Sequence, residues 1–246
     1  IPHGRIARDF ASYLELYYKY QAHYQIDEAL SGRRSEALLE QAARAPFDEK
    51  LSVISLVLAK LNVEFRKTGK MEDGLELLFE KLKAFKERLA EAGDGTPVQR
   101  LTAFTREVRE EYEGKKQAGL LTRVQIHRYE DICGTLDQYL LAAGEAEAQD
   151  GEALFGMLAA RFGEEREQYE DQCTAALQMV EYAFDFMEGA FGDSQEMVIF
   201  ITELNTSYDA VRFLEENPCE RYYQYNRKLL FEDREADIKR KLERLL

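Results

Sequence analysis

One run of apolar residues, from about Glu152 to Gly189, repeats at a near-heptad spacing that places it on one face of an α-helix. No stretch of useful length alternates apolar and polar residues, as a half-buried strand does. Only 4 of the 246 residues are proline, so few helices are interrupted. We therefore expect an all-α fold, an elongated multi-helix bundle that includes one long helix.

Shorter patterns predict the other helices. One begins near Pro46, centres its apolar face on Leu58 and ends at Thr68-Gly69, and another ends at residues 93–95. Helices over 96–117 and 122–142 start at Thr96-Pro97 and at a Thr122-x-x-Gln125 capping box. Their short connection predicts an antiparallel hairpin over 96–142, and its many charges indicate that it can project from the core.

Further patterns complete the chain. An aromatic stripe over 6–24 predicts a first helix, and 33–44 predicts a short second one. Capping patterns at Asp193-x-x-Glu196 and Thr206-x-x-Asp209 predict two more helices, and a charged helix ends the chain. The small, acidic stretch 142–151 is the best internal linker. It separates an N-terminal part (1–143) from a C-terminal part (144–246) that we expect to pack on the same core.

The segment 167–211 contains no Lys, Arg or His but ten Asp or Glu, among dense aromatic and aliphatic residues. Such a segment is either the wall of a buried core or a docking surface for a basic partner. The candidate partner surface consists of three acidic residues and a tyrosine cluster that follows them: Glu196, Glu203, Asp209, Tyr222, Tyr223 and Tyr225.

Composition restricts the class of partner and the compartment. A net charge of −14 argues against nucleic-acid binding, which relies on clustered cations. Cys133, Cys173 and Cys219 form no CxxC pattern and indicate free, mostly buried thiols in a reducing cytoplasm. We expect no membrane span, because no stretch approaches 18 uncharged apolar residues.

Patterns that carry catalysis or bind cofactors are missing from the sequence, which has no GxxxxGK[ST], GxGxxG, HExxH or GxSxG. The one local metal candidate is His127 with Glu130 and Asp131, which we interpret as a solvated helical face. A carboxylate-bundle enzyme would need Glu-x-x-His motifs on two helices, and Cys219 has no local His to activate it. We predict no catalytic, cofactor-binding or metal residues.

Four stretches together resemble the C-terminal helical region of bacterial MoxR-like AAA+ ATPases. They are RIARDFASYLELYYKYQAHYQID (5–27), PFDEKLSVISLVLAKL (46–61), DSQEMVIFITELN (193–205) and CERYYQYNRKLLFEDR (219–234). The resemblance implies an ATP-driven remodelling machine, and a homo-oligomer, in which ATP and Mg²⁺ bind an AAA+ module upstream of Ile1. It also implies a von Willebrand A-type protein as a partner. The chain, which starts at Ile rather than Met, is then a piece of a longer protein. The alternative is a stand-alone helical interaction module without ATPase coupling.

Overall fold

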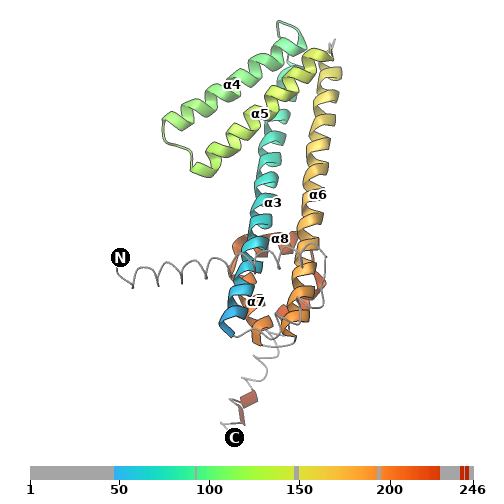
Figure 1. The fold of residues 1–246 in the computed structure, drawn as a ribbon. Coiled ribbons are helices and arrows are strands. Elements are labelled where there is room, and N and C mark those ends of the chain that lie inside the picture. The colour runs from blue at the N-terminus through green and yellow to red at the C-terminus, as the bar shows by residue number, and fades with distance from the viewer. Residues whose placement is uncertain are drawn as a thin grey trace, which may run out of the picture. The chain divides into compact units, whose positions relative to one another are not determined.

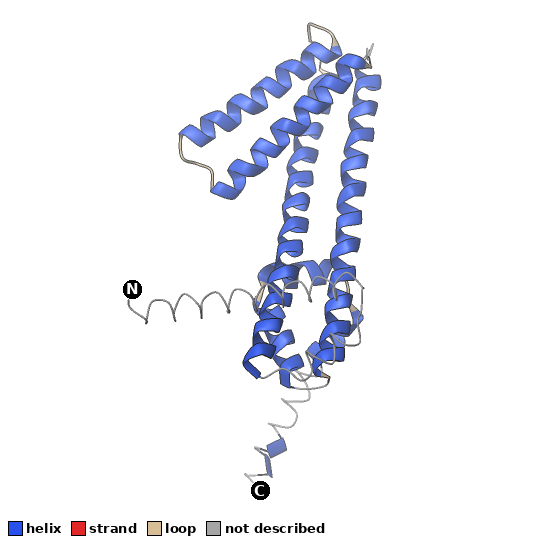
Figure 2. Ribbon diagram, viewed as in Figure 1, coloured by secondary structure: helices blue, strands red, loops and turns tan. Residues whose placement is uncertain are grey.

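Helices are the regular elements of the described part of the chain, coloured blue in Figure 2. The computed structural model describes residues 47–91, 93–146, 150–192, 195–227, 239–240 and 242–243. With the labels of Figure 1, its helices are α3 (Phe47–Ala90), α4 (Pro97–Gln117), α5 (Arg123–Glu145), α6 (Gly151–Phe191), α7 (Gln195–Thr206), α8 (Tyr208–Glu216) and α9 (Glu220–Arg227). The predicted all-α class is confirmed. The helices predicted over 6–24 and 33–44, the cap Asp193 and most of the C-terminal helix lie outside the described residues.

α3 is a single helix of 44 residues, and the predicted break at Thr68-Gly69 was wrong. A glycine inside a helix costs only about 1 kcal/mol relative to alanine, so packing elsewhere offsets it. Thr68 is itself buried and continues the buried stripe that includes Leu61 and Phe65. The centre of that stripe was also misplaced: Val57 is fully buried, whereas Leu58 is half-buried at its edge.

α6 is the predicted long helix and contains 41 residues. Asp150 caps its start, because the Asp150 Oδ1 atom accepts a hydrogen bond of 2.7 Å from the Ala153 N–H. The linker predicted over 142–151 is shorter than expected, since α5 continues to Glu145.

The contacts divide the chain into two compact units: residues 1–66 with 173–246, and residues 67–172. Both boundaries fall inside the long helices α3 and α6, so they do not coincide with the boundary predicted at 143/144. The small residues near 143 instead accompany a reversal of the chain inside the second unit. Ala143 on α5 and Leu154 on α6 belong to the same hydrophobic core there.

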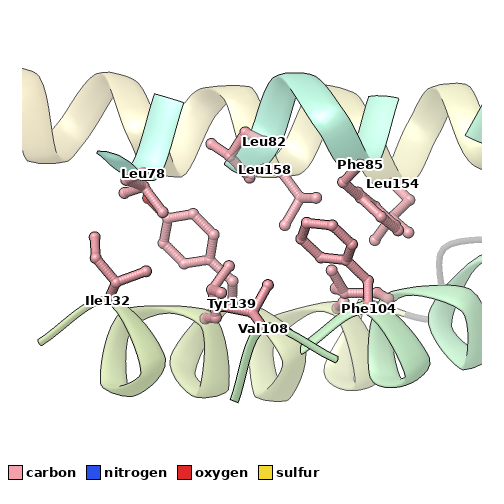
Figure 3. Close-up of a cluster of buried hydrophobic side chains, with 12 residues drawn as sticks. Leu78, Leu82, Phe85, Phe104, Val108, Ile132, Tyr139, Leu154 and Leu158 are labelled. Atoms are coloured by element: carbon pink, nitrogen blue, oxygen red, sulfur yellow. The ribbon is translucent and has the colours of Figure 1, made fainter. Parts of the chain in front are cut away.

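The unit formed by residues 67–172 has a core to which four helices contribute. Figure 3 shows the facing side chains of α3, α4, α5 and α6. Phe85 of α3 and Phe104 of α4 meet with their ring centroids 5.1 Å apart, next to Leu154 and Leu158 of α6. The full set of buried residues is Leu78, Leu82, Phe85, Leu101, Phe104, Val108, Ile132, Leu136, Tyr139, Ala143, Leu154 and Leu158. Burial of aliphatic and aromatic groups therefore holds the hairpin against the two long helices.

Arg100 closes the turn between α3 and α4. Its guanidinium donates hydrogen bonds to the carbonyl oxygens of Leu89 at 3.3 Å and Glu91 at 3.1 Å, and to that of Arg88. These carbonyls lie at the C-terminal end of α3, where a cation also offsets the helix dipole. The predicted start of α4 at Thr96 is confirmed, with a complete Thr96/Gln99 capping box.

α4 and α5 form the predicted antiparallel hairpin (Figure 1). α4 ends in a Schellman motif, in which the Leu120 N–H bonds the Lys115 carbonyl and the Gly119 N–H bonds the Lys116 carbonyl. Gly119 has φ +66, a left-handed conformation that glycine adopts without strain. The predicted Thr122/Gln125 capping box then starts α5. The base of the hairpin packs in the core described above, whereas its tip lies away from α6 (Figure 1).

In the other unit, α7, α8 and α9 contact the ends of the long helices. Phe184 of α6 meets Phe200 of α7 edge-on at 5.5 Å and stacks on Tyr225 of α9 at 5.7 Å. Phe65 of α3 packs on Phe213 of α8 at 5.1 Å. The helix predicted over residues 197–201 is confirmed. α8 is capped by Ser207 rather than by the predicted Thr206.

Candidate functional site

The acidic segment 167–211 forms the wall of a core. Fourteen of its residues are buried: Cys173, Ala176, Val180, Ala183, Phe184, Phe186, Met187, Ala190, Phe191, Met197, Phe200, Ile201, Leu204 and Ala210. Of the two interpretations that the sequence allows, core wall describes these fourteen residues. A docking role is therefore limited to the acidic residues that remain on its surface.

Three of these acidic residues lie on α6 and bind α9. Glu181, Asp185 and Glu188 follow one another at helical spacing. Asp185 pairs with Arg221, and Tyr225 donates a hydrogen bond of 2.9 Å from its hydroxyl to Glu188 Oε1. Glu181 contacts Arg221 at 3.7 Å and accepts a hydrogen bond of 3.2 Å from the Cys219 thiol. These carboxylates therefore hold the chain's own α9.

The tyrosines of the predicted partner surface are mainly structural. Tyr222 is buried, and its hydroxyl donates a hydrogen bond of 2.6 Å to Asn205 Oδ1. Tyr225 is half-buried against Phe184, as described above. Tyr223 is 39% exposed, but its hydroxyl donates to the Leu214 carbonyl at 2.7 Å. The aromatic cluster thus fixes α9 on α6, α7 and α8.

The acidic residues of the predicted surface lie in different surroundings. Glu203 on α7 is exposed and Glu196 is half-buried. Asp209 at the start of α8 pairs with Arg66 of α3 at 3.2 Å. The neighbouring Ser207 hydroxyl donates to Asn62 Oδ1 of α3 at 2.8 Å. Of the six residues, Tyr222 and Tyr223 are in ring contact at 5.4 Å, and the partner surface stays a prediction.

A row of ion pairs joins α3 to the hairpin. Lys70 pairs with Asp131 at 2.9 Å, and Asp73 pairs with Arg128; both partners lie on α5. Further along α3, Lys81 pairs with Glu111 at 2.9 Å and Arg88 pairs with Glu107, on α4. These pairs link both helices of the hairpin to α3. No local sequence pattern predicts these pairs, because the partners are 19 to 61 residues apart.

Two stacked tyrosines lie near the hairpin tip. The Tyr112 and Tyr129 rings are 5.5 Å apart and nearly parallel, and both pack on Cys133. The Tyr112 hydroxyl donates to Glu130 Oε1 at 2.9 Å and accepts from Lys116 Nζ at 2.8 Å. The hydrogen bonds that Glu130 accepts from Tyr112 and Lys116 lower the pKa of Glu130. The hydrogen bond from Lys116 to the Tyr112 hydroxyl raises the pKa of Lys116. The cluster is a structural brace between α4 and α5.

The residues considered for chemistry have structural contacts. His127 Nδ1 lies 3.4 Å from Glu130 Oε2, whereas Asp131 is paired with Lys70. Within the described ranges no group of three or more His, Cys, Asp or Glu side chains could hold a metal ion. The predicted buried state of the three thiols is confirmed, and burial raises the pKa of Cys219 to about 11. Among the helices described, none has the length and apolarity needed to cross a bilayer.

Comparisons with known proteins return no relative. No family model matches the chain, and neither the curated proteins nor the solved structures contain a match. The described part of the chain contains a hairpin that ion pairs and a hydrophobic core hold against α3.

Proposed function

We propose that this chain is an accessory helical domain of a cytoplasmic MoxR-like AAA+ ATPase, in which it contacts partner proteins or neighbouring subunits. The observation that carries the proposal is the length of α3 and α6, which are single helices of 44 and 41 residues. Long helices of this kind can move as levers when a nucleotide-driven module closes.

The braced hairpin supports the same proposal. Its core contacts and its row of ion pairs with α3 couple it to a helix shared by the two units. A movement of α3 would therefore carry the hairpin with it. The sequence of this chain has no phosphate loop. In this proposal ATP and Mg²⁺ bind upstream of Ile1, and a von Willebrand A-type protein is the expected partner by resemblance.

The first test is to determine the coding sequence upstream of Ile1. A GxxxxGK[ST] loop there, in the same reading frame, supports the proposal. Its absence favours the alternative of a stand-alone helical interaction module, for which the two well-formed cores are the supporting observation.

The second test breaks α3 in the parent protein. Gly69→Pro removes a helical hydrogen bond inside α3, at a cost of roughly 3 kcal/mol. Gly69→Ala is the matched control, because a Cβ at this position meets nothing within 4 Å. We expect Gly69→Pro to retain ATP hydrolysis and lose remodelling of a bound partner, and Gly69→Ala to retain both. Full remodelling by a folded Gly69→Pro protein would refute transmission through α3.

A further inference from the structure

The hairpin tip, residues 114–128, carries a charge opposite to that of the whole chain. Its fifteen residues include four cations (Lys115, Lys116, Arg123 and Arg128) and no Asp or Glu, in a protein of net charge −14. Arg128 is held by Asp73, and the two lysines pair with Glu111 and Glu130. Arg123 is exposed and makes no ion pair within the described part of the chain. It also lies in the first turn of α5, where the helix dipole disfavours a cation.

Two aliphatic side chains at the same tip are exposed to water. Leu120 is 72% exposed and Val124 is 57% exposed, whereas the neighbouring Leu121 packs against the tyrosine pair. The Schellman motif before Leu120 and the capping box after it hold the backbone in one conformation. The tip is therefore pre-organised, which lowers the entropic cost of binding.

α6 of the same unit presents the complementary charge. Glu167 and Asp171 are exposed, lie four residues apart on one helix face and make no ion pair among the described residues. Like charges at this spacing destabilise a helix, so a cationic partner would relieve them. Glu164 continues the face and pairs with Arg161 at 3.4 Å. Figure 1 places α6 away from the hairpin tip, so the tip does not neutralise this face in its own chain.

We infer that the hairpin tip docks on the acidic face of α6 in a second copy of this chain. Arg123 faces Glu167 and Asp171, and Leu120 and Val124 exclude water beside this contact. The two surfaces differ, so the contact is heterologous and repeats from copy to copy into a ring or a filament. This inference specifies the subunit contacts of the proposed function, and it does not require an ATPase module.

The test measures self-association of the chain by sedimentation velocity, at about 0.05 M and about 0.5 M salt, over which screening removes exposed charge pairs. We expect association at low salt that weakens at high salt. Arg123→Glu and Leu120→Asp should each weaken it by roughly tenfold, a typical effect for interface charges and anchors. Arg106→Glu and Leu141→Asp are the matched controls, because both residues are exposed on the hairpin outside the tip, and they should change little.

A charge exchange separates docking from misfolding. Asp171→Arg alone should weaken association, and combined with Arg123→Glu it should regain much of the loss. A monomer at every salt concentration, or a double variant no better than either single one, would overturn the inference. So would binding of the tip to phosphatidylserine vesicles in place of a second copy. None of these results bears on the coding sequence upstream of Ile1, so the proposed function is tested separately.

Discussion

Two buried tyrosines provide a paired test of the packing. Tyr139 is 3% exposed and Tyr222 is 5% exposed, so the same Tyr→Phe change removes one hydroxyl from two similar environments. Tyr139 lies in the hydrophobic core of the unit 67–172, and its hydroxyl makes no hydrogen bond within the described structure. The Tyr222 hydroxyl donates to Asn205 Oδ1 at 2.6 Å.

The two substitutions should change stability in opposite directions. An unpaired buried hydroxyl costs roughly 1–3 kcal/mol by protein mutational data, so Tyr139→Phe should stabilise by about 1–2 kcal/mol. Tyr222→Phe loses a hydrogen bond between neutral groups and should destabilise by about 1 kcal/mol, since Asn205 keeps its contact with Asn226.

Urea unfolding followed by far-UV circular dichroism measures both free energies of unfolding. A difference of about 2–3 kcal/mol between the two variants is the expected result. If Tyr139→Phe destabilises by more than about 0.5 kcal/mol, its hydroxyl has a partner and the reasoning fails. Leu141→Phe, at a 67% exposed position on the same helix as Tyr139, controls for a general effect of a phenyl ring.

Three further perturbations test other parts of the structure. Burial raises the pKa of Cys219 from 9.0 to about 11, so the stability that the neutral thiol contributes is intact below pH 9.0 and is lost as the pH rises towards 11. The loss is roughly 2–3 kcal/mol at most. Cys219→Ala should flatten this loss of stability in urea titrations over the same pH range. Leu61→Ala, at a fully buried site, should cost about 2–5 kcal/mol, and Leu58→Ala clearly less; equal costs by urea unfolding would contradict the assigned face of α3. Arg100→Ala should cost about 1–2 kcal/mol in thermal unfolding through loss of the α3 C-terminal contacts, and an unchanged midpoint would argue against this cap.

Features that depend on neighbouring residues were predictable. The near-heptad spacing predicted α6, and the Thr96-Pro97 start and the Thr122/Gln125 capping box begin α4 and α5 as expected. The prediction failed at Gly69, because a small helical penalty is outweighed by burial contributed by residues distant in sequence. It also missed the cap of α8 by one residue: Ser207 caps the helix, in line with the preference for serine over threonine at this position.

The candidate surface was less predictable than the helices. Tyr222 and Glu203 both qualified by residue type, yet one is in the core and the other is exposed. The type of a residue indicates whether its side chain can bind a partner, whereas the exposure of that side chain depends on which helix packs over it. The hairpin tip had a visible signal, a run of cations without acids, but its exposed Leu120 and Val124 could be identified only after folding.

The amino-acid order alone determined that this protein is helical and where most helices begin, because periodicity, capping and turn formation act over a few residues. The tertiary structure decided that α3 continues through Gly69, that α9 is held by the carboxylates of α6, and that Lys70 meets Asp131. Such contacts join residues far apart in the chain, and their energies depend on burial and distance, which exist only once the helices have packed.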